Sequence, residues 1–152
     1  MSDLLQTTSE RPRTRVPWLT DLSIVVGATV SSLVAWLCLA QLAGVDLEVG
    51  SGGSVREVGG LAVAVTTLLT SLVGVLVLRA LESRGTGGLR TWSVVAVVVT
   101  LVSFLGPLGA TTGAAKGVLL ALHTIVATVV IVGAHRSRAA FGAVPQEART
   151  TA

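Results

Sequence analysis

Residues 58–78 decide the fold, and they read VGGLAVAVTTLLTSLVGVLVL. These 21 residues contain no charged side chain. A helix of about 20 residues crosses a hydrocarbon core about 30 Å thick. Three further windows, 22–45, 91–115 and 117–135, hold 24, 25 and 19 residues and are equally free of Asp, Glu, Lys and Arg. The pattern predicts an all-α integral membrane four-helix bundle with antiparallel up-down topology.

The composition supports the same class. The chain of 152 residues is 51% hydrophobic and 12% charged, whereas soluble domains carry about 25% charged residues. We predict a polar tail over 1–17, a transmembrane domain over 18–136 and a second tail over 137–152. The predicted helices run over about 20–44, 58–80, 90–106 and 112–135. The Gly-rich loop between the first two is expected to be a flexible connection.

Positive charge predicts the orientation. Nine of the 11 Lys and Arg residues lie in the N-terminal tail, between the second and third windows, or in the C-terminal tail. Only Arg56 and Lys116 lie on the other side. The positive-inside rule therefore places both termini in the cytoplasm of a multi-pass membrane protein. Trp18 and Trp92 then fall at the cytoplasmic ends of helices, where indole rings prefer the headgroup level.

Small residues recur at a spacing of four in three of the windows. Residues four apart share one helix face, and small side chains let transmembrane helices approach closely. The candidate packing residues are Gly27, Ser31, Gly74, Gly113, Gly117 and Ala121. Ordinary packing within the chain is the simpler interpretation, and a dedicated dimer face is the alternative.

His123 is the one titratable side chain well inside a window, apart from the lone Cys38. It is interpreted either as a proton relay or ligand, or as a neutral imidazole hydrogen-bonded to a neighbouring hydroxyl. The hydroxyl residues at comparable depth are Ser31, Ser32, Thr70, Ser71 and Thr100.

Signatures of catalysis and cofactor binding are absent from the sequence. It contains no H-E-x-x-H, G-x-S-x-G, P-loop or C-x-x-C motif. His123 and His135 are about 18 Å apart along one helix, too far to ligate one haem iron. We therefore expect a protein that is not an enzyme, with no cofactor, no metal and no catalytic residue. The basic clusters lack the interleaved aromatic residues of single-strand binders, so no nucleic-acid partner is expected.

Several short motifs carry a resemblance to a known family. They are LAGVD at 42–46, LESR at 81–84, TW at 91–92, SFLGP at 103–107 and LH at 122–123. The pattern over roughly residues 21–136 resembles the four-helix membrane proteins of actinobacteria grouped as domain-of-unknown-function family 6069. The resemblance implies a bacterial inner-membrane location and brings no known activity or functional residues.

Two classes of function follow from these observations. The first is a non-enzymatic structural or accessory membrane protein that acts through helix packing, in contact with the lipid bilayer and with a second copy or a membrane-protein partner. The second is a small transporter or channel with a Ser/Thr-lined path around His123. A polar cavity at His123 would favour transport, and a closely packed bundle would favour the first class.

Overall fold

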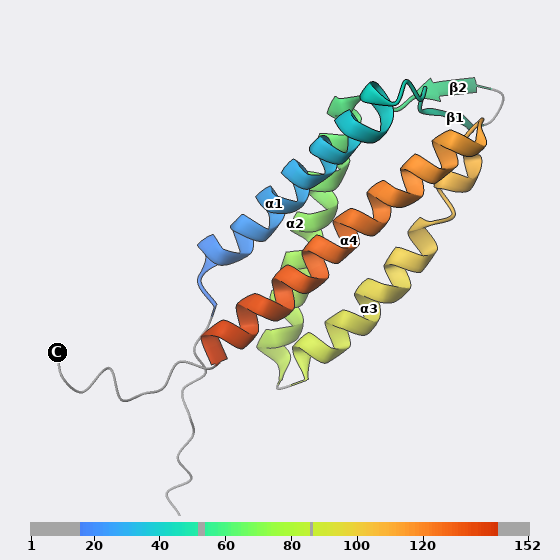
Figure 1. Cartoon of the computed structure of the whole chain (residues 1–152). Helices are drawn as coiled ribbons and strands as arrows, with labels where there is room; N and C mark the ends of the chain where they lie inside the picture. The colour runs from blue at the N-terminus through green and yellow to red at the C-terminus, as the bar shows by residue number, and fades with distance from the viewer. Residues whose placement is uncertain (1–15, 52–53, 86, 143–152) are drawn as a thin grey trace, which may run out of the picture.

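Four long helices dominate the computed structural model, which describes residues 16–51, 54–85 and 87–142. They are α1 (Trp18–Trp36), α2 (Gly60–Arg84), α3 (Gly88–Ser103) and α4 (Gly113–Gly142). Within the described residues, four helical segments are long and apolar enough to cross a membrane. Consecutive helices run in opposite directions, and α1 packs against both α2 and α4 while α3 lies on the far side of α2 and α4 (Figure 1).

The helix ends differ from the predicted ones in two consequential places. Helix α1 begins at Trp18, so that Asp21 lies in its first turn. Helix α4 runs to Gly142, seven residues past the predicted end at 135. Asp21 in the first turn of α1 and Arg138 in the added part of α4 lie outside the charge-free windows, and they pair with each other.

The glycine-rich connection after α1 is an ordered hairpin in its described part, so the prediction of a flexible loop was wrong there. Helix α1 continues through a π-helical segment, η1 (Leu37–Leu42), before strands β1 (Glu48–Ser51) and β2 (Ser54–Glu57) pair antiparallel. The register pairs Ser51 with Ser54, a spacing typical of tight two-residue hairpins. Residues 52–53 lie outside the described part of the chain.

The hairpin is tied to the connection between α3 and α4, which contains the short 3-10 helix η2 (Pro107–Gly109). Val49 forms an antiparallel bridge with Ala110, and the amide of Thr111 donates to the carbonyl oxygen of Glu48 at 3.0 Å. These bonds join both connections at one end of the bundle, which we call the hairpin end.

Gly44 ends the first helical segment. Its φ of +64° is the left-handed conformation that favours glycine. The next amide, on Val45, donates to the carbonyl oxygen of Ala40 at 2.9 Å. This is the 6→1 bond of a Schellman motif, which satisfies a carbonyl at the helix terminus and turns the chain toward the hairpin.

Two clusters of buried residues hold the bundle together. The first, at the hairpin end, contains Ala40, Leu47, Ala110, Ala115, Leu119 and Leu122. The second, toward the opposite end, contains Ala28, Leu78, Trp92, Val130 and Ala134. The indole of Trp92 is 2% exposed and Nε1 donates to the carbonyl oxygen of Gly74 at 2.8 Å. Its ring therefore packs between helices, and its predicted position at the headgroup level stays a prediction.

The glycines expected to mediate close packing do not do so within the chain, and a dimer face at these residues stays a prediction. A Cβ placed on Gly27, Gly74, Gly113 or Gly117 would meet no heavy atom within 4 Å. Ser31 and Ala121 are only half-buried. Tight contacts occur instead at other glycines, such as Gly133, where a Cβ would lie 3.1 Å from the side chain of Ile24 on α1, and Gly60, where it would lie 2.9 Å from the ring of Trp36. Spacing identifies a shared helix face but does not say which face meets a neighbour.

Candidate functional site

A crevice of about 970 Å³ lies between α2, α3 and α4. Each helix contributes one face, with residues recurring three and four apart, as on α3 at Trp92, Val95, Ala96, Val99 and Thr100. Pockets that bind small molecules have volumes of roughly 300–1,000 Å³, so the crevice is large enough for a ligand.

The crevice is long and open on one side. Its lining residues on α2 run from Ala62 to Val77, which corresponds to about 22 Å of helix. Val73 on α2 and Val99 on α3 line it and are also about half exposed. These residues form a rim through which the crevice opens between α2 and α3.

Small side chains explain why the space is not filled. Ala62, Thr66, Thr70 and Gly74 form a stripe at a spacing of four on α2, and all four line the crevice. Ala96 on α3 and Ala127 on α4 line it as well. The small-residue stripe of α2 therefore forms the wall of a cavity instead of a tight helix contact.

The structure brings together five of the six residues predicted as a polar site. His123, Ser32, Thr70, Ser71 and Thr100 all line the crevice, although they come from four different helices. Ser31 does not line it, because it lies on another face of α1 than Ser32. Thr66, Thr67 and Ser103 also line the crevice and were not predicted.

The imidazole of His123 has a defined arrangement. Its Nδ1 lies 2.7 Å from the backbone carbonyl oxygen of Leu119. A carbonyl oxygen only accepts, so Nδ1 carries the hydrogen and donates it. In the neutral ring, Nε2 then offers a lone pair. No hydrogen bond to Nε2 is formed by any residue in the part of the chain that the structure describes.

Four of the hydroxyl groups donate to carbonyl oxygens of their own helices. Ser71 donates to Thr67 at 2.6 Å and Thr100 donates to Ala96 at 2.7 Å. Ser32 and Ser103 donate to the carbonyl oxygens of Thr29 and Thr100, at 2.9 and 2.7 Å. Because a hydroxyl has one hydrogen, each of these groups presents only lone pairs to a further partner.

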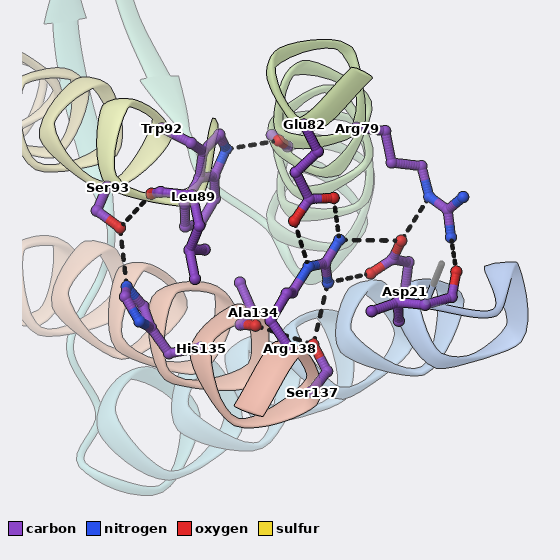
Figure 2. Close-up of polar contacts among 12 residues, drawn as sticks. Asp21, Arg79, Glu82, Leu89, Trp92, Ser93, Ala134, His135, Ser137 and Arg138 are labelled. Atoms are coloured by element: carbon purple, nitrogen blue, oxygen red, sulfur yellow. Dashed lines mark hydrogen bonds and ion pairs between the residues drawn. The ribbon is translucent and has the colours of Figure 1, made fainter. Parts of the chain in front are cut away.

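A second polar site lies at the end of the bundle opposite the hairpin and was not predicted. Figure 2 shows the guanidinium of Arg138 between the carboxylates of Asp21 and Glu82. Nη1 of Arg138 donates to Oδ1 of Asp21, and Nε donates to Oε1 of Glu82 at 3.0 Å. Arg79 donates to Oδ2 of Asp21 from Nε at 2.5 Å. We call these four residues the ion cluster.

The ion cluster is electrically balanced and is buried at its centre, whereas Arg79 and Glu82 are 30% and 31% exposed. The side chain of Asp21 is 0% exposed and that of Arg138 is 9% exposed. Two carboxylates face two guanidinium groups, so that every buried charge has an opposite partner. The position of Asp21 also suits the helix dipole, because Asp21 lies in the first turn of α1.

Further contacts complete the polar network at this end. Nη2 of Arg79 donates to the carbonyl oxygen of Val16 at 2.9 Å, and its guanidinium lies 4.6 Å from the ring centroid of Trp18. Ser93 on α3 lies 2.8 Å from Nε2 of His135 on α4. The Ser93 hydroxyl donates to Leu89, so Nε2 of His135 donates to Ser93. All four helices are thereby connected by polar contacts (Figure 2).

Neither site has the composition of a metal centre. No group of three or more His, Cys, Asp or Glu side chains is placed to hold a metal ion within residues 16–51, 54–85 and 87–142. The crevice offers one imidazole, a set of hydroxyls and, on β2 at the hairpin end, Arg56 and Glu57, whereas the ion cluster offers two carboxylates already occupied by arginines. The chemistry available in the crevice is hydrogen bonding in apolar surroundings.

Comparison with known proteins gives one match. A family model described as "Family of unknown function (DUF6069)" matches residues 12–140. No curated protein and no solved structure matches the chain.

Proposed function

The chain belongs to the family of unknown function DUF6069, and from that premise we propose that it is a non-enzymatic accessory protein of the bacterial inner membrane. In this proposal, the crevice between α2, α3 and α4 binds a small, largely apolar molecule taken up from the bilayer. The observation that carries the proposal is the crevice itself, with a volume of about 970 Å³ and one set of polar groups around His123.

The lining supports a lipid-like ligand. Most lining residues are aliphatic, and the charged ones, Arg56 and Glu57, lie on β2 at the hairpin end. An open rim between α2 and α3 allows entry from the side, where lipid surrounds a transmembrane bundle. Apolar walls with a few convergent polar groups are typical of ligand sites.

The hydrogen bonds support binding without catalysis. A hydroxyl nucleophile needs a base within hydrogen-bonding distance. In the described residues, His123 bonds to a backbone carbonyl, and the bonded hydroxyls of the crevice also donate to backbone carbonyls. The imidazole is therefore arranged as a fixed polar contact for a ligand.

A small transporter or channel remains the second candidate, favoured by the row of hydroxyls beside His123. In that case the crevice would be one half of a path. Trp92 lines the crevice and is packed with Leu78, Val130 and Ala134, so the path would have to open through this buried cluster. Because such an opening would disrupt the second cluster, we favour the binding function.

We further propose that both termini face the cytoplasm, which puts the hairpin end outside. To test this, Val55 on β2 and Gly87 before α3, both exposed, are replaced singly by Cys in a Cys38→Ala background. An impermeant thiol reagent should label Val55→Cys in intact cells and Gly87→Cys only after lysis. Labelling of Gly87→Cys in intact cells would contradict the orientation.

The binding function is tested by filling the crevice. Val99 and Val98 are adjacent on α3 and are 54% and 53% exposed, but only Val99 lines the crevice. The probe is a long-chain primary alcohol with a photoreactive group in its chain, added to the full-length protein. We expect saturable labelling of α2, α3 and α4, reduced at least about tenfold in affinity by Val99→Trp because the indole occupies the site.

Val98→Trp is the matched control and should label like the wild-type protein, because its side chain faces away from the crevice. Equal labelling of the two variants, or labelling that does not saturate, would show that the probe binds only as bulk lipid does. Either result would refute the binding function.

A further inference from the structure

The polar groups in the crevice restrict which ligands it can bind. The neutral ring of His123 has one N–H hydrogen, and Nδ1 donates it to the carbonyl oxygen of Leu119. The lone pair of Nε2 is therefore left for a ligand. Ser32, Ser71, Thr100 and Ser103 likewise use their hydroxyl hydrogens within their own helices. Five groups around the crevice are therefore hydrogen-bond acceptors, and their donors are already occupied.

The remaining hydroxyls do not reverse this bias. Thr66, Thr67 and Thr70 line the crevice and make no side-chain hydrogen bond to another residue in the described part of the chain. Their hydroxyls can rotate, so they accept as readily as they donate. Trp92 offers no donor either, because Nε1 already donates to Gly74.

We propose, on the basis of the proposed function, that the polar group of the bound molecule is an uncharged hydrogen-bond donor, the hydroxyl of a long-chain alcohol or phenol, and that Nε2 of His123 accepts its hydrogen bond. A ligand carbonyl or ether at this position would bring two acceptors together without a hydrogen between them. Its desolvation would go uncompensated, which disfavours binding in apolar surroundings.

The charge of the crevice favours a neutral donor over an ammonium group. Glu57 is the only carboxylate among the lining residues, and it lies on β2 at the hairpin end beside Arg56. A cation near His123 would be buried among aliphatic side chains and neutral hydroxyls. Burying a charge without a partner costs far more than burying a hydroxyl.

The test compares two ligands of the same chain, one with a hydroxyl donor and one with a methyl group in place of its hydrogen. A long-chain primary alcohol and the methyl ether with the same chain compete with the photoreactive alcohol for the full-length protein. In the wild-type protein we expect the alcohol to compete about tenfold better than the ether, the usual effect of one hydrogen bond. In His123→Leu this preference should fall to about onefold, while the affinity for the ether stays the same.

Two further variants make the outcome specific. His135→Leu removes the other histidine, which lies outside the crevice, and should keep the tenfold preference. His123→Phe preserves the ring and replaces His123→Leu if that variant does not fold. Equal competition by alcohol and ether in the wild-type protein overturns the inference and leaves the proposed function intact. A preference for the alcohol that is retained in the His123 variants has the same consequence. Absence of saturable labelling in the wild-type protein refutes the proposed function itself.

Discussion

Replacing Arg138 by Leu should lower the free energy of unfolding by about 3–5 kcal/mol, the cost of removing one partner from a buried ion pair. Asp21 is fully buried and would keep only Arg79, while Glu82 would lose its partner. The ion cluster also connects α1, α2 and α4, so its loss affects three helix contacts. The measurement is reversible unfolding of the purified protein in mixed micelles.

Arg136→Leu is the matched control, because Arg136 is exposed and lies two positions away on the same helix. Its effect should stay within about 0.5 kcal/mol, as for ordinary surface substitutions. The double variant Asp21→Leu/Arg138→Leu should recover part of the loss, since apolar side chains leave fewer unpaired buried charges. Equal losses for Arg138→Leu and Arg136→Leu would show that the ion cluster contributes nothing to stability.

The helices could be predicted from the sequence because a charge-free run of about 20 residues is long enough for a helix to cross a bilayer. Four apolar helices of sufficient length were predicted, and four are present among the described residues. The ion cluster was not predicted, because counting arginines to assign the orientation assumes that each one is a solvated anchor. The sequence did contain one signal, Asp21, an acidic residue directly beside a long apolar window. A buried position tolerates a carboxylate only if a cation faces it.

Several residues that line the crevice could be predicted from the sequence, but the shape of the crevice could not. His123, Thr70, Ser71 and Thr100 lie at similar depths, so a bundle of four helices brings them together. Whether the faces between them touch depends on helix rotation and tilt, which residue spacing does not determine. Gly74 faces the crevice for this reason, whereas Gly133 closely contacts Ile24 on α1.

Hydrogen bonds at the hairpin were equally hidden from pattern analysis. The bridge between Val49 and Ala110 joins residues 61 positions apart, and neither lies in a recognisable motif. A pair of glycines at 52 and 53 between short polar runs indicates either a linker or a tight hairpin turn. The choice between a linker and a hairpin depends on the pairing of the hairpin edge with the connection between α3 and α4.

Trp92→Ala should lower the free energy of unfolding by about 3 kcal/mol. The indole fills the second cluster between Ala28, Leu78, Val130 and Ala134, and its removal leaves a cavity. The loss comes from van der Waals contacts and one hydrogen bond, because the hydrophobic effect adds little between helices already in an apolar medium. Unfolding in mixed micelles measures it.

The other tryptophans and the hydrogen bond separate these contributions. Trp92→Phe retains a ring and loses the bond from Nε1 to Gly74, so it should cost about 1 kcal/mol. Trp18→Ala removes a ring that is 44% exposed and stacked on Arg79, which should cost at most about 1 kcal/mol. If Trp92→Ala were no more destabilising than Trp18→Ala, the ring would not be a packed element, and the closed end of the crevice would have to be reconsidered as an open path.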